Sequence, residues 1–274
     1  MKRILVPVSI DEASEKALKL ATALSKKSNA RVYVLRVVKT HGGAKFNSKG
    51  EIVDDSGGDL EQYKEQKRIE TEQLKEWTNA INPEAYQVVS YGGVADVILD
   101  TMKKYKVSLV ILGNTYSKQE NRFFGDLTSY LIKKSTAPIL SLKADLTEHS
   151  LNHIVFANEF DHKLSYYDAL QDLHLFFETK VDFLKISTSK DEDEAMVNEN
   201  MDYFARANMI KKFDKHISKS SHVEEGILQW ISSNPCDLLA VKNITRKGGS
   251  PLFRKKMTKQ FLRNMNVSTL IYND

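Results

Sequence analysis

Runs of aliphatic residues alternate along the chain with longer segments whose apolar residues recur at helical spacing. Four of the runs are almost entirely apolar, which predicts strands buried on both faces, as in parallel sheets. A fifth run is shorter and predicts a shorter strand. The strands are predicted at Ile4–Val8, Val32–Val38, Val88–Ser90, Leu109–Leu112 and Ile139–Leu142.

The segments between these strands predict helices, because their apolar residues are three or four positions apart. Asp11 or Ser14 provides an N-cap for the first helix, since short polar side chains accept hydrogen bonds from the free amides there. The segment His41–Asp59 is rich in Gly, Ser and Asp and predicts a mobile loop. The helices are predicted at Ala13–Lys27, Leu60–Ala80, Ala95–Tyr105 and Leu127–Lys134.

This order of segments occurs twice. The counterparts of the first two segments lie about 150 positions later and those of the last three about 130 later, so the second copy is shorter. The boundary falls in the polar stretch Lys143–Asn152, and we therefore expect domains at residues 1–146 and 147–274. The matching pairs are Arg3–Val8 with His153–Asn158, Arg31–Val37 with Lys180–Ile186, Val94–Leu99 with Val223–Leu228, Leu109–Asn114 with Leu238–Asn243, and Ala137–Ser141 with Ser268–Tyr272.

Strands that alternate with helices predict an α/β fold, here two tandem doubly wound parallel-sheet domains. Within each domain we expect the strand order 3-2-1-4-5. Ligands of such sheets bind at the carboxyl ends of the strands, where the strand order reverses. The candidate site therefore follows Val8, Val37 and Leu112.

Composition narrows the class of protein. Of 274 residues, 41% are hydrophobic and 28% charged, which is typical of globular proteins and argues against disorder. No stretch of 18 apolar residues is present, and the N-terminus has no apolar core of a signal peptide. The single cysteine, Cys236, fits a reducing compartment, so we expect a cytoplasmic protein. The net charge of +4 is too small to indicate a nucleic-acid binder.

Several segments of the first copy resemble the universal stress protein family. They are Ile4–Ser14, Asp96–Leu99, Ser108–Gly113, Phe124–Leu127 and Ala137–Leu140. The resemblance covers nearly all of the first copy, whereas the second copy follows it in pattern only. It implies a tandem member of the family, with an adenine nucleotide alpha hydrolase-like, Rossmann-like fold in each copy.

The family includes ATP-binding members, and the resemblance implies where ATP would bind. In those members an Asp after the first strand contacts the ribose. The phosphates are contacted by two glycine-containing segments, which lie near the start of the fourth helix. Backbone amides at a helix start suit phosphates because they donate hydrogen bonds at the positive end of the helix dipole. The candidate residues are Pro7, Ser9, Val37, Leu112, Gly113, Tyr116, Gly125, Asp126 and Leu127.

Three of these candidates depart from the family pattern. Ser9 replaces the ribose-binding Asp, Tyr116 replaces the second glycine, and Asp126 replaces the serine that contacts phosphate. A carboxylate at a helix start occupies the free amides and repels phosphates. ATP is therefore a doubtful cofactor. Gly113 and Gly125 can instead serve strand–helix packing, with Asp126 as a plain N-cap.

The second copy lacks every glycine of the phosphate-binding pattern, although Glu159 could substitute for the ribose-binding Asp. It has instead a segment with eight basic residues and no acidic one, from Lys242 to Arg263. The segment either binds an anion or is the solvated face of a helix. The anion-binding candidates are Lys242, Arg246, Lys255 and Lys256.

Other chemistry is not indicated. The seven histidines show no paired metal-binding spacing, so we expect no metal site and no catalytic residue. Cys236 is expected to be a buried, inert thiol, and Trp77 and Trp230 to be packing residues.

Three functions remain open. The first is a non-enzymatic stress-response regulator that acts through protein partners. The second is an ATP- or AMP-binding regulator, with or without slow ATP hydrolysis. The third is an anion- or nucleic-acid-binding module. Nucleic acid and membrane are not the expected partners. The resemblance implies that the last strands, Pro138–Leu142 and Ser268–Tyr272, join the two copies as an intramolecular pseudo-dimer.

Overall fold

A computed structural model gives the fold of the chain and describes residues 1–38, 44–46, 52–55, 60–113, 120–143, 146–147, 149–161, 166–189, 191–243 and 266–273. Its helices are α1 (Glu12–Ser28), α2 (Leu60–Ile81), α3 (Val94–Tyr105), α4 (Glu120–Lys134), α5 (Asp168–Phe177), α6 (Glu194–Ala207) and α7 (Val223–Ser233). Its strands are β1 (Arg3–Val8), β2 (Arg31–Val38), β3 (Ala44–Phe46), β4 (Ile52–Asp55), β5 (Tyr86–Tyr91), β6 (Leu109–Gly113), β7 (Ile139–Leu142), β8 (His153–Ala157), β9 (Lys180–Ser187), β10 (Phe213–Lys219), β11 (Leu238–Asn243) and β12 (Ser268–Asn273).

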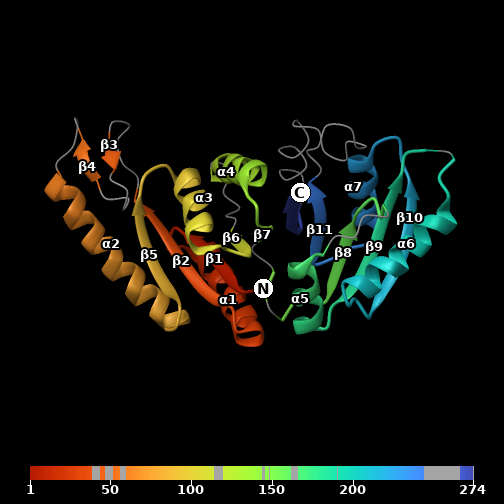
Figure 1. The fold of residues 1–274 in the computed structure, drawn as a ribbon, viewed down its shortest axis with the longest axis horizontal. Coiled ribbons are helices and arrows are strands. Elements are labelled where there is room, and N and C mark those ends of the chain that lie inside the picture. Colours follow the sequence, from red (N-terminus) through yellow and green to blue (C-terminus); the bar gives the residue numbers. More distant parts are fainter. Residues whose placement is uncertain are drawn as a thin grey trace.

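Ten of the strands form one sheet in the order β10-β9-β8-β11-β12-β7-β6-β1-β2-β5. Each half of this sheet has the order 3-2-1-4-5 that the sequence predicts, with parallel pairing within the half. The predicted α/β class with two doubly wound halves is therefore confirmed, and the two halves are joined in one continuous sheet. The halves meet where β7 and β12 pair antiparallel, with Leu140 opposite Leu270 (Figure 1).

Two hydrophobic cores lie on the two faces of the sheet, and each extends through both halves. One contains buried residues of α1, α2, α5 and α6, and the other those of α3, α4 and α7. Trp77 packs against the first core and Trp230 against the second, as expected of packing residues. Alternate residues of β7 and β12 contribute to opposite cores, because successive side chains of a strand point to opposite faces.

Contacts between side chains and backbone tie the halves together near this junction. The Lys143 amide of the first half donates to Ser268 Oγ of the second at 2.9 Å. Within the second half, the Leu170 amide of α5 donates to the Tyr272 hydroxyl of β12 at 2.6 Å. The N-terminal amine of Met1 forms an ion pair with Asp172. Helix α1 of the first half also contacts α5 of the second (Figure 1).

The structure differs from the sequence predictions in three places. Helix α4 begins at Glu120 and not at Leu127, so the interpretation of Asp126 as an N-cap is wrong. The segment predicted as a loop between His41 and Asp59 contains the antiparallel pair β3–β4. Strand β10 was not predicted, because this edge strand has mostly polar, partly exposed residues and no apolar run.

Among the described residues, no helix has the length and apolar character needed to cross a membrane.

Candidate functional site

The structure gathers several of the sequence-predicted residues at one edge of the first half. Strand β1 lies between β2 and β6, and the strand order reverses between β1 and β6. Pro7 and Ser9 lie at the carboxyl end of β1, Val37 at that of β2, and Leu112 and Gly113 at that of β6. This is the switch point at which doubly wound sheets bind ligands.

The turn that follows β1 is closed by its own hydrogen bonds. The Ser9 amide donates to Ser14 Oγ at 3.0 Å, and the Ser14 amide donates to Asp11 Oδ1 at 2.7 Å. Asp11 is thus the N-cap of α1, one of the two residues the sequence offered for this role. The side-chain groups of Asp11 and Ser14 therefore already accept from backbone amides of the turn.

Ile10, within this turn, has a left-handed backbone with φ 58°. A β-branched residue rarely adopts this conformation, so surrounding contacts must hold the turn in place. In the second half Phe160, 150 positions later, has φ 51°. The turns after the first strands of the two halves therefore share a backbone conformation as well as a place in the fold.

Gly113 allows β6 to approach α1 closely. A Cβ atom added at Gly113 would lie 2.3 Å from the Ala13 carbonyl oxygen and 2.9 Å from the Ser14 nitrogen. Both are backbone atoms, so no side-chain rotation could relieve the overlap. The glycine at this position is therefore required for packing between strand and helix.

The other first-half candidates lie apart from a helix start. Gly125 and Asp126 are inside α4, five and six positions after its first residue, Glu120. Leu127 packs against the core on the α3, α4 and α7 face. Tyr116 lies outside the described residues.

At the corresponding edge of the second half, Glu159 forms an ion pair with Lys185, which also contacts Glu192 at 3.1 Å. The Lys185 side chain is only 7% exposed. Burial lowers the pKa of Lys185, but the hydrogen bonds and charges of the two glutamates outweigh this effect, so its pKa is raised overall. Glu159, the substitute considered for the ribose-binding Asp, is thus engaged within the protein.

Of the predicted anion-binding residues, only Lys242 belongs to the described part of the chain. It lies near the end of β11, in register with Tyr272 of β12. Arg246, Lys255 and Lys256 lie outside the described residues, so the predicted basic site stays a prediction.

A second cluster of polar residues escaped the sequence analysis. Asp182, Asp214 and His216 offer ligand atoms within 4.8 Å of one another, although no two of the seven histidines are paired at a metal-binding spacing in the sequence. They come from β9 and β10, and only the register of these neighbouring strands brings them together. The nearby thiol of Cys236 has its pKa raised to about 12, mainly by burial, which fits the inert thiol that we expected.

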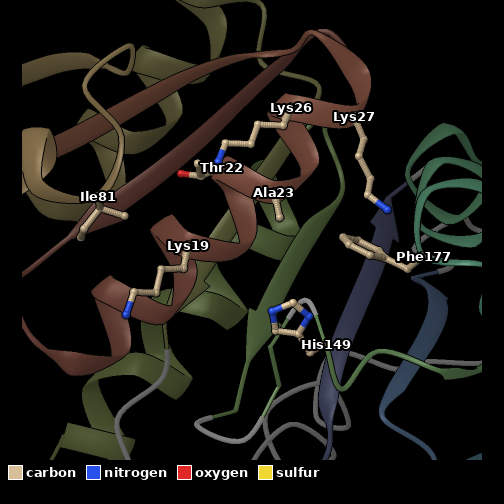
Figure 2. A pocket seen from close by; sticks show the side chains of 8 residues that line it. All are labelled: Lys19, Thr22, Ala23, Lys26, Lys27, Ile81, His149 and Phe177. Carbon is tan, nitrogen blue, oxygen red and sulfur yellow. The ribbon is translucent and has the colours of Figure 1, made fainter.

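A cavity of about 500 Å³ lies where the two halves meet, and none of its lining residues is a predicted site residue (Figure 2). Three of its lysines, Lys19, Lys26 and Lys27, come from α1. Lys19 is paired with Glu15 at 2.6 Å, and Lys27 donates to the Phe176 carbonyl and lies 5.0 Å from the centre of the Phe177 ring. Two of the three ammonium groups are therefore already engaged by the protein.

Comparisons with known proteins agree with the resemblance. The model of the universal stress protein family matches residues 1–143. A universal stress protein from Archaeoglobus fulgidus DSM 4304 is 13% identical and has a TM-score of 0.71, covering 99% of this chain and 98% of its own. A putative universal stress protein from Pseudomonas aeruginosa UCBPP-PA14 is 12% identical with a TM-score of 0.64, covering 100% and 93%.

A further solved structure, the cytoplasmic domain of a prokaryotic cation chloride cotransporter, is 10% identical with a TM-score of 0.52, covering 98% of this chain and 94% of its own. No curated protein matches the chain. At these identities the structural matches show a shared fold over both halves.

Proposed function

Because the chain belongs to the universal stress protein family, we propose that it is a non-enzymatic, cytoplasmic stress-response regulator that acts through protein partners. In this proposal the two halves form an intramolecular pseudo-dimer through β7 and β12. The nucleotide site of the first half is degenerate, meaning that it lacks groups that ATP would require. Membranes and nucleic acids are not the partners.

The observation that carries this proposal is the state of the switch-point edge in the first half. Where the resemblance places a ribose-binding carboxylate, the chain has Ser9, whose amide is bonded to Ser14. Gly113 is in contact with the backbone of α1, and Gly125 and Asp126 lie inside α4. The amides of α4 at those positions are thus within the helix and not at its free start, so they do not suit a phosphate.

The second half supports the same conclusion. An ATP ribose would need Glu159 as a free acceptor, and Glu159 is paired with the buried Lys185. Releasing Glu159 would leave the buried ammonium of Lys185 with Glu192 as its one remaining partner in the described part of the chain, at part of the roughly 3–5 kcal/mol that an unpaired buried charge costs. Binding a ribose there would have to offset that cost.

Calorimetry with ATP and Mg²⁺, and separately with AMP, tests the proposal. We expect dissociation constants above about 100 μM, which corresponds to a binding free energy of less than roughly 5.5 kcal/mol. We also expect no release of phosphate from ATP. Ser9→Asp restores the carboxylate of the family pattern and should strengthen ATP binding. Ser221→Asp, at an exposed serine far from the edge, is the matched control and should leave ATP binding unchanged.

Tight binding of ATP or AMP by the natural chain would refute the degenerate site and favour a nucleotide-binding regulator. Tight, salt-dependent binding of a polynucleotide, lost when Lys242, Lys255 and Lys256 are changed to Ala, would favour the anion-binding alternative.

A further inference from the structure

The amino ends of three neighbouring strands in the second half carry a cluster of ionisable groups, on the opposite edge of the sheet from the switch point. Asp182 of β9 lies in register with Asp214 of β10, and His153 begins β8. His216 is two residues beyond Asp214, so both side chains point to the same face. The ligand atoms of Asp182, Asp214 and His216 all lie within 4.8 Å of one another.

Two carboxylates in register on neighbouring strands repel each other, so the pairing of Asp182 with Asp214 requires a cation. Within the chain this cation is Lys180, whose Nζ lies 3.0 Å from Asp182 Oδ1 and 2.7 Å from Asp214 Oδ2. The Asp182 side chain is only 6% exposed, whereas that of Lys180 is 38% exposed. Asp182 is thus held within the fold, whereas Asp214 is 58% exposed and the cation between the two carboxylates is on a flexible side chain that can withdraw into solvent.

The tautomer of His153 also indicates a cation beside Asp182. His153 Nδ1 is 3.1 Å from the Pro235 carbonyl oxygen, which can only accept, so Nδ1 carries a proton. His153 Nε2 is 2.9 Å from Asp182 Oδ2. In a neutral ring these two atoms are both acceptors, and their contact is favourable only if a proton or a metal ion is between them. A ring that donates to a carbonyl through one nitrogen and binds metal through the other is the usual arrangement of metal-bound histidine.

His216 contributes a second imidazole next to the same carboxylate. Its Nε2 is 3.5 Å from Asp182 Oδ2 and, among the described residues, is shielded from solvent without a hydrogen-bond partner. The ring of Trp230 lies 5.1 Å away, centre to centre, and restricts how the imidazole can turn.

The first half shows that the fold does not require charge at this place. By the strand repeat, Tyr33 and Tyr86 occupy the positions of Asp182 and Asp214, and they are in register in the same way. Their rings stack at 5.3 Å, and Tyr105 stacks on Tyr33 at 4.5 Å. An aromatic stack thus suffices in one half, so the buried carboxylate of the other half indicates a different use.

We propose that Asp182, Asp214 and His216 bind a divalent transition-metal ion of the zinc class, which displaces the ammonium of Lys180. His153 Nε2 lies 2.9 Å from Asp182 Oδ2 but outside this group of mutually close atoms, so its ring moves towards the ion to become the fourth ligand. Two imidazoles with two carboxylates suit zinc and its neighbours better than magnesium or calcium, which prefer oxygen ligands alone. Bonds of about 2.0–2.2 Å to a tetrahedral ion separate its ligand atoms by roughly 3.4 Å, close to the observed contacts of Asp182 Oδ2. This site is independent of the proposed nucleotide-edge function.

The test uses Trp230 as the reporter, in a full-length Trp77→Phe background that leaves one tryptophan. Zn²⁺ is counted by elemental analysis after gel filtration, and Co²⁺ is titrated while visible absorption and Trp230 fluorescence are recorded. We expect one ion per chain, the absorption bands of four-coordinate cobalt, and quenching that Zn²⁺ reverses by competition.

Variants then separate a built site from nonspecific binding. His216→Gln and, at the more exposed carboxylate, Asp214→Asn should each weaken Co²⁺ binding by about 10-fold or more. His222→Gln, at an exposed histidine before α7, is the matched control and should leave binding unchanged. Lys180→Met should strengthen binding, since it removes the competing ammonium.

The proposal is wrong if no Co²⁺ or Zn²⁺ binds at about 1 mM free ion, a concentration at which failure to bind marks negligible affinity. It is also wrong if His216→Gln and Asp214→Asn bind Co²⁺ as well as the parent chain does, or if the His222→Gln control loses as much Co²⁺ affinity as these two variants. Weaker or unchanged binding by Lys180→Met would show that the ion does not take the place of the ammonium.

Discussion

Replacing Gly113 by Ala tests whether this glycine serves packing or ligand binding. The added Cβ would lie 2.3 Å from the Ala13 carbonyl oxygen, 2.5 Å from its carbonyl carbon and 2.9 Å from the Ser14 nitrogen. Carbon and oxygen atoms in contact prefer separations of about 3.5 Å, so β6 and α1 would have to move apart by roughly 1 Å. Both elements belong to the core, since Ala17, Leu109 and Ile111 are fully buried.

The loss of stability expected for Gly113→Ala follows from the overcrowding that the added methyl group causes. Extra methyl groups forced into a packed core usually cost about 1–3 kcal/mol, and here the contacts are to backbone that cannot change rotamer. We therefore expect Gly113→Ala to reach the upper part of that range. At roughly 2–4 °C per kcal/mol for a chain of this size, the melting temperature should fall by about 6–12 °C.

Thermal unfolding followed by circular dichroism, without any ligand, measures this effect. Gly93→Ala is the matched control, because its Cβ would meet only the flexible Asp96 side chain at 3.3 Å and the change should cost less than about 1 kcal/mol. If Gly113→Ala melts within a degree of the parent chain and instead weakens ATP binding, the packing argument is wrong and the glycine serves a ligand.

Three further predictions concern other parts of the fold. His174 is buried and neutral, since its Nδ1 donates to the Thr179 carbonyl and its Nε2 accepts from the Lys211 amide. Burial lowers its pKa, so the free energy of unfolding, measured with urea, should fall as the pH drops below the unfolded pKa of about 6.5. In His174→Gln the free energy of unfolding should depend less on pH. Cys236 is half-buried and has a pKa of about 12, so about one ten-thousandth of it is thiolate at pH 8. Ellman's reagent should therefore label it slowly when folded and rapidly in guanidinium, and comparable rates would contradict the raised pKa. Leu270→Pro removes a backbone N–H donor from β12, which lies between β11 and β7. X-ray scattering should therefore show a larger particle and calorimetry a lower melting temperature. A particle of unchanged size would mean that this strand does not join the halves.

The fold was largely predictable because its central strands are buried on both faces. Such strands leave continuous apolar runs, as in β1 and β6, whose residues are nearly all buried. Strand β10 lies at the edge of the sheet, where partial exposure permits polar residues such as Lys215 and His216, and so it left no apolar run. The early start of α4 was missed for a related reason, because most of its first seven residues, Glu120–Asp126, are polar or Gly and show no apolar residues at helical spacing.

The candidate site was less predictable, because its character depends on contacts between distant residues. The sequence identified Ser9, Gly113 and Glu159 as positions of interest, but not that Gly113 contacts Ala13 or that Glu159 pairs with Lys185. The cluster around Asp182 depends on the register of β8, β9 and β10. A one-residue shift in that register would move Asp214 to the other face, so no spacing along the chain could have revealed the cluster.

The two halves have the same fold but differ in which edge of the sheet carries unusual chemistry. At the switch-point edge, the polar groups of both halves are engaged by the protein itself, through Ser14 in the first and Lys185 in the second. At the opposite edge, the first half has stacked tyrosines and the second half has the buried carboxylate Asp182. Burying a carboxylate is costly, and apolar residues of similar volume often serve stability as well or better. Since Tyr33 shows that an aromatic residue is accommodated at this place in the fold, stability alone does not account for Asp182, and a bound metal ion would.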